Sequence, residues 1–333
     1  IPDFPDMQLI IDGKKARTNF QGSDFDFMVA YNAAENRALV AIMDKFRTAL
    51  HDMGLTLRRF DGAGAVAAAM YKVNEVTESY PSKNEPALPE EVEQAARHAY
   101  FGGRIEIGKY GRHNGTIYHY DINSAYPAQQ RHLPALRGGE WSHIKITKKN
   151  RDKYRKAIEN DEMQVLTCIK LRWDHLSDIA FCPFPFRSEL QNKVLFPPSG
   201  TNWLWTPEVR AALCEQKNYP HWTIDILEIW EFTPLSGFKP FGWISDYYKK
   251  RQQIVAESKR TGIPNGQEKV IKLGLNSLYG KTAQRIGHRI DEKSGMTIRP
   301  PFHNLAYAGY ITSAARAMLW RAAMQAPNDI ICL

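Results

Sequence analysis

The chain has 333 residues, of which 43% are hydrophobic and 24% are charged, so it can bury the cores of two or three modules and is not of the disordered class. Its formal net charge of +8 favours a polyanionic partner, although many soluble enzymes carry a similar excess. No apolar run approaches the roughly 20 residues that span a membrane. The four cysteines form no Cys-x-x-Cys pair, which favours core thiols in a reducing compartment over a zinc site or disulfide framework. We expect a cytoplasmic protein with no membrane partner.

The N-terminal eighty residues predict a short strand followed by a helix. Met7–Ile11 is the predicted strand, with a hairpin turn at Asp12-Gly13. Asn32 and Glu35 have the spacing of a capping box, and the apolar residues after them keep helical spacing: Leu39, Ile42, Met43, Phe46, Leu50 and Met53. We expect this helix to be amphipathic and packed. Gly62–Met70 lacks the G-x-G-x-x-G spacing, so close helix packing is favoured over a phosphate loop.

Residues 73–90 predict an exposed linker, because they combine prolines with charged and polar residues. A helix is expected from about Glu90, and it leads into Tyr100-Phe-Gly102-Gly103-Arg104. The two glycines allow a phosphate to approach the backbone closely, and Arg104 supplies positive charge. An ordinary glycine turn is the alternative.

The stretch from Ile117 to Pro127 predicts a strand that turns abruptly into a helix. Ile117 to Tyr120 are β-branched or aromatic residues, whereas Asn123 and Ser124 are types that start helices. Asp121 therefore falls at the carboxyl end of the predicted strand, where a carboxylate is exposed and rigidly held.

Beyond this point the chain predicts mixed strands and helices and then a helical hairpin. Strands are expected at Val165–Leu171 and Thr223–Phe232, with Thr206-Pro207 opening a helix between them. Several basic residues crowd one section and indicate a solvated helix face more than a DNA contact: Lys145, Lys148, Lys149, Arg151, Lys153, Arg155 and Lys156.

The hairpin is predicted from Trp243–Lys259 and Gln267–Lys281, joined by a turn at Thr261–Gly266. Three residues of the second arm lie three or four positions apart, so they share one helix face: Lys272, Asn276 and Tyr279. That face can contact a single ligand.

Two motifs in this order resemble the family B DNA polymerases. The order Asp121-x-x-Ser124-x-Tyr126-Pro127 is similar to motif A of that family, and Lys272-Leu-Gly-Leu-Asn276-Ser-Leu-Tyr279-Gly280-Lys281 is similar to motif B. Further elements resemble the protein-primed subgroup of phages and mobile elements: Tyr100-x-Gly102-Gly103, which contacts the template strand there, and Thr312-x-x-Ala315-Arg316, which grips primer DNA.

The resemblance implies an α+β fold: a polymerase palm, which is an antiparallel sheet backed by helices, with a helical-hairpin fingers domain. Tyr31-x-x-x-Glu35 resembles the end of the family's exonuclease domain, with Glu in place of Asp, so capping is favoured over metal binding for Glu35. The implied domains are the end of an exonuclease-like domain (1–80), a linker with the Tyr-x-Gly-Gly motif (81–104), palm with room for an insertion (105–240), fingers (241–283) and palm again (284–333).

The implied activity is template-directed transfer of deoxynucleotides to a primer 3′-hydroxyl, with two Mg²⁺ ions, or Mn²⁺, as cofactors. Asp121 and the carbonyl of Ile122 would bind metal, and Tyr126 would lie against the sugar 2′ position, with Ser124 also at the nucleotide. Arg251 and Lys272 would bind the triphosphate, with Lys272 as proton donor to pyrophosphate. Asn276 and Tyr279 would line the nascent base pair. The implied DNA-binding residues are Tyr100, Gly102, Gly103, Arg104, Thr312 and Arg316.

The implied partners are primer-template DNA and deoxynucleoside triphosphates, with a terminal protein as a primer option. Two alternatives stay open: a catalytically silent polymerase-like module that only binds DNA, and a primase or primer-independent polymerase on the same palm. Asp329–Leu333 resembles the strand that leads into motif C of the family. Because Asp121 alone cannot hold two metals, we expect the natural protein to continue beyond Leu333 with an Asp-x-Asp turn.

Overall fold

The computed structural model describes residues 4–60, 62–81, 87–176, 179, 181–188, 193–284, 286–290 and 297–333. The helices in chain order are α1 (Met7–Ala16), α2 (Phe25–Asp52), α3 (Ala63–Val73), α4 (Glu90–His98), α5 (Ala125–Gln130), α6 (Arg151–Glu159), α7 (Thr206–Glu215), α8 (Ile244–Thr261), α9 (Gly266–Thr282) and α10 (Leu305–Ala323). Short 3-10 turns lie at Gly22–Asp24, Val76–Ser79 and Gln216–Asn218. None of the described helices is long and apolar enough to cross a membrane.

The main sheet is antiparallel, with strand order β1-β6-β2-β5. Its strands are β1 (Glu140–Lys145), β2 (Thr167–Asp174), β5 (Gly200–Trp205) and β6 (Thr223–Thr233). Two small hairpins pair β3 (Phe186–Ser188) with β4 (Lys193–Leu195) and β7 (Arg289–Ile290) with β8 (Thr297–Ile298). The α+β class with an antiparallel sheet is therefore confirmed, although the sheet lies entirely within residues 140–233.

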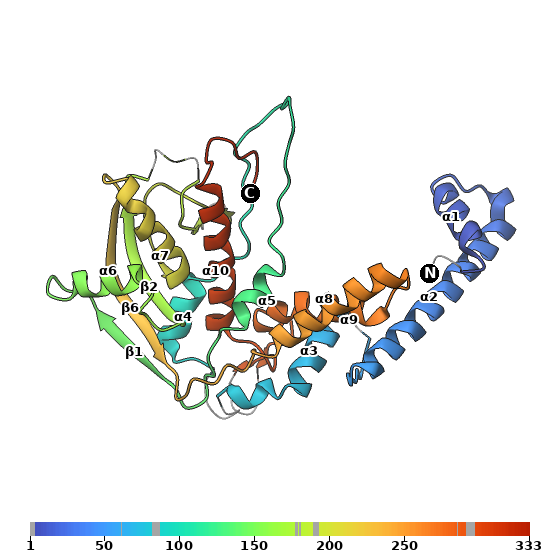
Figure 1. Ribbon diagram of the computed structural model, residues 1–333, viewed down its shortest axis with the longest axis horizontal. Helices are drawn as coiled ribbons and strands as arrows, with labels where there is room; N and C mark the ends of the chain where they lie inside the picture. Colours follow the sequence, from blue (N-terminus) through green and yellow to red (C-terminus); the bar gives the residue numbers. More distant parts are fainter. Residues whose placement is uncertain are drawn as a thin grey trace.

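The sheet buries one face under α7 and α10 (Figure 1). Ile169, Leu171 and Trp173 alternate along β2 with more exposed residues, as expected for a strand with one covered face. Val209 of α7 and Trp320 of α10 pack into the same apolar cluster. The other half of α10 belongs to a second cluster, which it shares with α3, α4 and α9. Helix α10 therefore joins the sheet to the helical part of the chain.

The helical hairpin is formed by α8 and α9, and it lies on α3 (Figure 1). Asn265 caps α9, because its side-chain oxygen accepts a hydrogen bond of 2.9 Å from the Gln267 amide. The prediction of close packing by small residues is confirmed: a Cβ on Gly274 of α9 would lie 2.5 Å from the sulfur of Met70 on α3. The helices predicted from Glu90, at Thr206 and across the hairpin are also confirmed.

The N-terminal prediction is wrong in two respects. Residues 7–16 form helix α1 and not a strand with a hairpin turn. Helix α2 begins at Phe25, so Asn32 lies inside it, and the capping box is made by Gln21 and Asp24 one turn before the helix. The spacing of Asn32 and Glu35 misplaced the start of the helix. Residue types that cap a helix also occur inside helices, so their spacing alone does not locate the first turn.

Helix α2 is also less packed than expected. It extends away from the rest of the chain, with α1 at its far end (Figure 1). Leu39, Val40 and Ile42 are exposed, whereas Ala49 and Leu50 near its carboxyl end are buried. The predicted amphipathic helix exists, but only its last turns are covered by the main body of the chain.

The predicted strand at residues 117–120 is absent. These residues belong to a long extended segment that projects from the body, and Tyr118 and Tyr120 are 73% and 85% exposed. A β-branched or aromatic run becomes a strand only where another strand pairs with it, and no described residue does so here. The base of the segment pairs elsewhere, because Glu106 and Leu333 exchange backbone hydrogen bonds of 3.2 and 2.9 Å.

We predict that Gly274→Val lowers the free energy of unfolding by about 1–3 kcal/mol, because the added side chain must displace the fully buried Met70. Urea denaturation would measure this difference. Gly280→Val is the matched control on the same helix, since nothing lies within 4 Å of a Cβ at Gly280. Equal losses in the two variants would contradict tight packing of α9 on α3.

Candidate functional site

Three separate sequence motifs meet at a tyrosine cluster, which we define as Tyr100, Tyr126 and Tyr279. Tyr126 lies in the first turn of α5, and its ring centroid is 4.8 Å from that of Tyr279 on α9. The Tyr279 hydroxyl shares a hydrogen bond of 2.9 Å with the hydroxyl of Tyr100, which follows α4. Burial, followed by the hydrogen bond to Tyr100, raises the pKa of Tyr279, so its hydroxyl stays protonated. The fold therefore brings the predicted nucleotide-binding tyrosines into contact.

Gly103 completes this contact from the loop side. A Cβ at this position would lie 2.9 Å from the hydroxyl of Tyr126. The glycine thus permits a close approach of the Tyr100–Arg104 backbone to α5. Gly102 and Gly103 are both exposed, which leaves their backbone accessible to a ligand.

The exposed face of α9 presents Lys272 and Asn276, one turn apart. The opposite face buries Ile271, Leu275 and Leu278. The predicted shared face is therefore confirmed as a geometric arrangement. Lys272 makes no ion pair with any described residue, so its charge is available to an anionic ligand.

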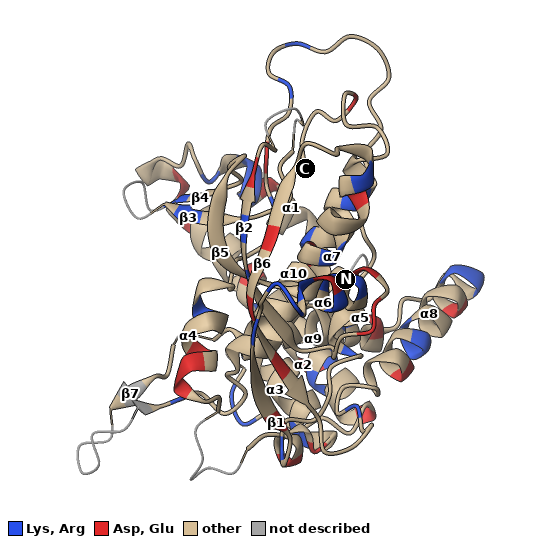
Figure 2. Cartoon of the chain, turned by 90° about the vertical axis from the view of Figure 1, so that its left-hand side faces the viewer, with Lys and Arg blue, Asp and Glu red and all other residues tan. Residues whose placement is uncertain are grey.

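Arg251 is predicted to bind a triphosphate, but in this structure its guanidinium is paired with a carboxylate. Its Nε and one terminal nitrogen both donate to Oε1 of Glu268 on α9, each at 2.9 Å. Glu268 precedes Lys272 by one helical turn, so Arg251 lies beside the exposed face but its charge is already compensated. Basic residues occur at several positions along α8 (Figure 2).

Asp121 and Ile122 lie just before α5, at the end of the extended segment. Asp121 is exposed, and Ser124 enters the helix with φ 51°, a left-handed conformation that is uncommon for serine. The position of the carboxylate is therefore set by the start of α5 and not by a strand. Within the described ranges there is no group of three His, Cys, Asp or Glu residues that could hold a metal ion.

Arg104 points into the protein and is 5% exposed. It donates 2.8 Å to the carbonyl of Cys182, forms an ion pair with Glu106 and lies 4.0 Å above the ring centroid of Phe196. Burial lowers the pKa of Arg104, and Glu106 offsets part of this effect. The side chain is therefore engaged within the protein, and its contact with a phosphate stays a prediction.

Thr312 and Arg316 on α10 are likewise engaged within the protein. The Thr312 hydroxyl donates to the carbonyl of Ala308 at 3.1 Å within α10. Arg316 is 2% exposed and forms two hydrogen bonds of 2.8 Å with the carboxylate of Glu208, which is also 2% exposed. Its remaining terminal nitrogen donates to the carbonyls of Phe101 and Gly102 at 2.8 and 2.6 Å. Arg316 is therefore a buried clamp on the Tyr-x-Gly-Gly loop, and the grip of Thr312 and Arg316 on primer DNA stays a prediction.

The carboxylates that pair with these cations were not expected from the sequence. Glu208 lies in the first turn of α7, where an acidic residue is ordinarily explained by the helix dipole. Glu268 has the same place in α9. Sequence alone offers no signal for either pairing, because each partner lies on another element.

The motifs that converge on the tyrosine cluster include those that resemble polymerase motifs A and B. Similarity to known proteins identifies the class of protein. Residues 28–293 match the family of type B DNA polymerases, organellar and viral, and the chain belongs to this family. It is 25% identical over 248 residues to the DNA polymerase of Acidianus bottle-shaped virus (isolate Italy/Pozzuoli), covering 69% of this chain and 31% of that polymerase.

The fold is similar to that of Phi29 DNA polymerase. Its orthorhombic crystal form matches with a TM-score of 0.55 and 16% identity, over 95% of this chain and 52% of that one. The same polymerase complexed with primer-template DNA matches with a TM-score of 0.52 and 17% identity, over 94% and 52%. The chain thus spans about half the length of the polymerase structures that it resembles.

We predict that Arg316→Ala lowers the free energy of unfolding by about 3–5 kcal/mol, because it leaves the buried Glu208 carboxylate unpaired. Urea denaturation of both single variants and of Arg316→Ala/Glu208→Ala would measure their coupling. Arg260→Ala, which removes an exposed pair with Glu257, is the control and should change stability little. Additive losses for Arg316 and Glu208 would contradict the clamp.

Proposed function

We propose that this chain provides the nucleotide-binding part of a DNA-directed DNA polymerase that adds deoxynucleotides to a primer 3′-hydroxyl. The supporting observation is the tyrosine cluster, which joins the helix after Asp121, the helix that carries Lys272 and the Tyr-x-Gly-Gly loop. In this proposal the two helices contact the nascent base pair, and the Tyr-x-Gly-Gly loop contacts the template nearby.

In this proposal Tyr126 excludes a 2′-hydroxyl, because its ring is fixed against Tyr279 and cannot move away from a sugar without breaking that contact. Lys272 binds the triphosphate as an unpaired cation on the exposed face of α9, and it donates a proton to the leaving pyrophosphate. Asn276 lies one turn further on the same face, where it would contact the base pair.

In this proposal Arg251 pairs with Glu268 when no nucleotide is bound and with the triphosphate when one is. Its pair with Glu268 orients the guanidinium beside Lys272, and a triphosphate would compete with Glu268 for it. Lys272 should therefore contribute more to nucleotide affinity than Arg251 does, because only the charge of Arg251 is already compensated.

Divalent metal would supply electrostatic stabilisation of the attacking and leaving oxygens. Asp121 and the carbonyl of Ile122 are suitable oxygen ligands. They fit part of a two-ion site only, since each ion keeps several oxygen ligands and the described residues contain no group of three His, Cys, Asp or Glu that could hold a metal ion. We therefore propose metal binding at Asp121.

We further propose that the protein acts in replication of a phage or mobile element, with primer-template DNA as its partner. A terminal protein is one route by which synthesis would be primed. The alternative function is that of a polymerase-like module that binds DNA without catalysis. Metal-dependent incorporation separates these two functions.

We predict that Asp121→Asn reduces incorporation to background and leaves primer-template binding nearly intact, because it removes a metal ligand and no phosphate contact. Primer extension in Mg²⁺ and a DNA-binding measurement on the natural full-length protein would test this. Asp174→Asn, an exposed carboxylate at the end of β2, is the control. A wild-type rate in Asp121→Asn would remove the proposed role, and no metal-dependent synthesis by the wild type would favour the silent module.

We predict that Lys272→Ala raises the KM for deoxynucleotides by about tenfold or more, since a charge-assisted contact contributes about 1.5–3 kcal/mol. Arg251→Ala should have a smaller effect because Glu268 already compensates its charge. Lys249→Ala is the matched control. Lys249 lies two positions before Arg251 on α8 and therefore on the opposite face of the helix. Steady-state kinetics on the natural full-length protein would measure all three, and a loss of DNA affinity without a change in KM would contradict the assignment.

A further inference from the structure

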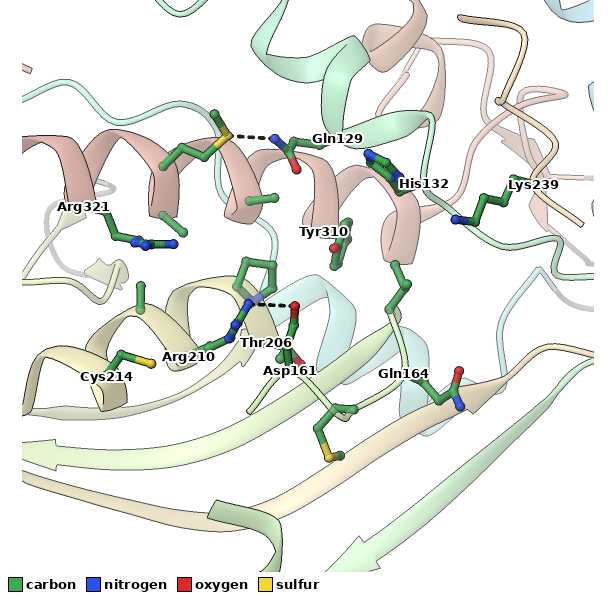
Figure 3. A pocket seen from close by; sticks show the side chains of 17 residues that line it. Gln129, His132, Asp161, Gln164, Thr206, Arg210, Cys214, Lys239, Tyr310 and Arg321 are labelled. Atoms are coloured by element: carbon green, nitrogen blue, oxygen red, sulfur yellow. Dashed lines mark hydrogen bonds and ion pairs between the residues drawn. The ribbon is translucent and has the colours of Figure 1, made fainter. Parts of the chain in front are cut away.

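A separate cavity of about 470 Å³ lies between α5, α7 and α10 (Figure 3). Its residues on α10 include Ala314, Ala317, Met318 and Arg321. Met318 is two positions from Arg316, about 200° around the helix, so the cavity lies on the face of α10 away from the buried clamp. None of the nucleotide-binding residues proposed above lines it.

The lining is rich in hydrogen-bond donors and positive charge. Arg210, Lys239 and Arg321 line the cavity, together with His132. Asp161 is the one carboxylate in this lining, and it already pairs with Arg210 at 2.8 Å. Neither Lys239 nor Arg321 forms an ion pair with any described residue. The cavity therefore has a net positive charge, because Asp161 compensates only one of its cations.

These groups are distributed along the cavity. Figure 3 shows Arg321 at one end, Lys239 and His132 at the other, and Tyr310 with the Arg210–Asp161 pair between them. The Tyr310 hydroxyl makes no hydrogen bond with the described residues. Burial, with Asp161 as the next cause, raises the pKa of Tyr310 to about 12, so this hydroxyl remains a neutral donor.

The walls between the charged ends are apolar and uncrowded. Met163, Pro207 and Met318 face the cavity with the small side chains of Ala211 and Ala314. Methionine side chains adapt to flat or irregular ligands, and sites of several hundred Å³ take small molecules. Arginine and lysine at both ends match phosphate, which accepts several charge-assisted hydrogen bonds.

We propose that this cavity binds a phosphorylated ligand of nucleotide size, with phosphate against the cationic ends and base or sugar against the apolar walls. The ligand is either a free nucleotide or one nucleotide of a single strand. Because the site uses neither Asp121 nor the face of α9, its occupation does not depend on polymerase activity.

The test uses the 333-residue chain in the presence of EDTA, which removes divalent metal from the nucleotide site proposed above. Binding of thymidine 3′,5′-bisphosphate and of a fluorescent pentathymidylate would be measured by calorimetry and anisotropy. Arg321→Gln/Lys239→Gln should weaken binding about tenfold or more, since each change removes a charge-assisted contact. Both side chains are exposed, so this variant should keep the fold.

Two further variants make the test specific. Lys15→Gln/Arg47→Gln removes the same charge from exposed positions on α1 and α2 and should leave affinity nearly unchanged. Ala314→Leu fills the cavity without a change in charge and should weaken binding as strongly as the double variant. Thermal unfolding would confirm that each variant is folded.

His132 provides an independent readout. Burial, then Arg131 and Lys239, lower the pKa of His132. An anion in the cavity should raise it, because negative charge favours the protonated ring, and NMR titration would detect this shift. Binding of the bisphosphate identifies a free nucleotide, whereas binding of the pentathymidylate alone identifies a strand. No binding by either probe, or equal weakening by the control and cavity variants, would overturn the proposal.

Discussion

The buried guanidinium of Arg316 is the constraint on which the functional site depends. An arginine that is almost wholly removed from water must have every donor paired, or the fold loses several kcal/mol. Glu208 of α7 satisfies one edge of the guanidinium, and the carbonyls of Phe101 and Gly102 satisfy the remainder. Helix α10 is thereby bound to α7 and to the Tyr-x-Gly-Gly loop at one point, and the carbonyls of that loop cannot turn away without leaving the cation unpaired.

This fixed loop then holds the two motif helices. Tyr100 and Gly103 lie on either side of the clamped carbonyls, and they contact Tyr279 of α9 and Tyr126 of α5. Behind the cluster the hydroxyl of Tyr71 on α3 donates 2.9 Å to the carbonyl of Leu278, and Gln130 of α5 donates to the same hydroxyl. The tyrosine cluster is therefore positioned by hydrogen bonds from α3, α5 and the loop, and by packing of α9 on α3.

The parts that would meet substrate are held less firmly than this frame. Asp121 is attached to α5 on one side and to an exposed extended segment on the other, so its carboxylate is fixed only through the helix start. Arg251 is held by an ion pair that is partly accessible to solvent and open to competition by a phosphate. Rigid tyrosines next to less constrained charged groups suit a site whose base pair must fit closely while phosphate and metal are exchanged.

The sequence alone determined the motifs, the hairpin and the shared face of Lys272 and Asn276, because these follow from residue order and helical period. The α+β class was implied by the resemblance that the motifs carry. Tertiary structure decided which arginine side chains are paired with other groups of the protein. Arg104 and Arg316 had the composition of DNA contacts, yet Arg104 donates to the carbonyl of Cys182 and Arg316 pairs with Glu208 of α7, both far along the chain. It also decided that residues 117–120 form no strand, since β propensity is realised only through a pairing partner. Pairing, whether of strands or of charges, is a relation between distant residues, and no local pattern specifies it.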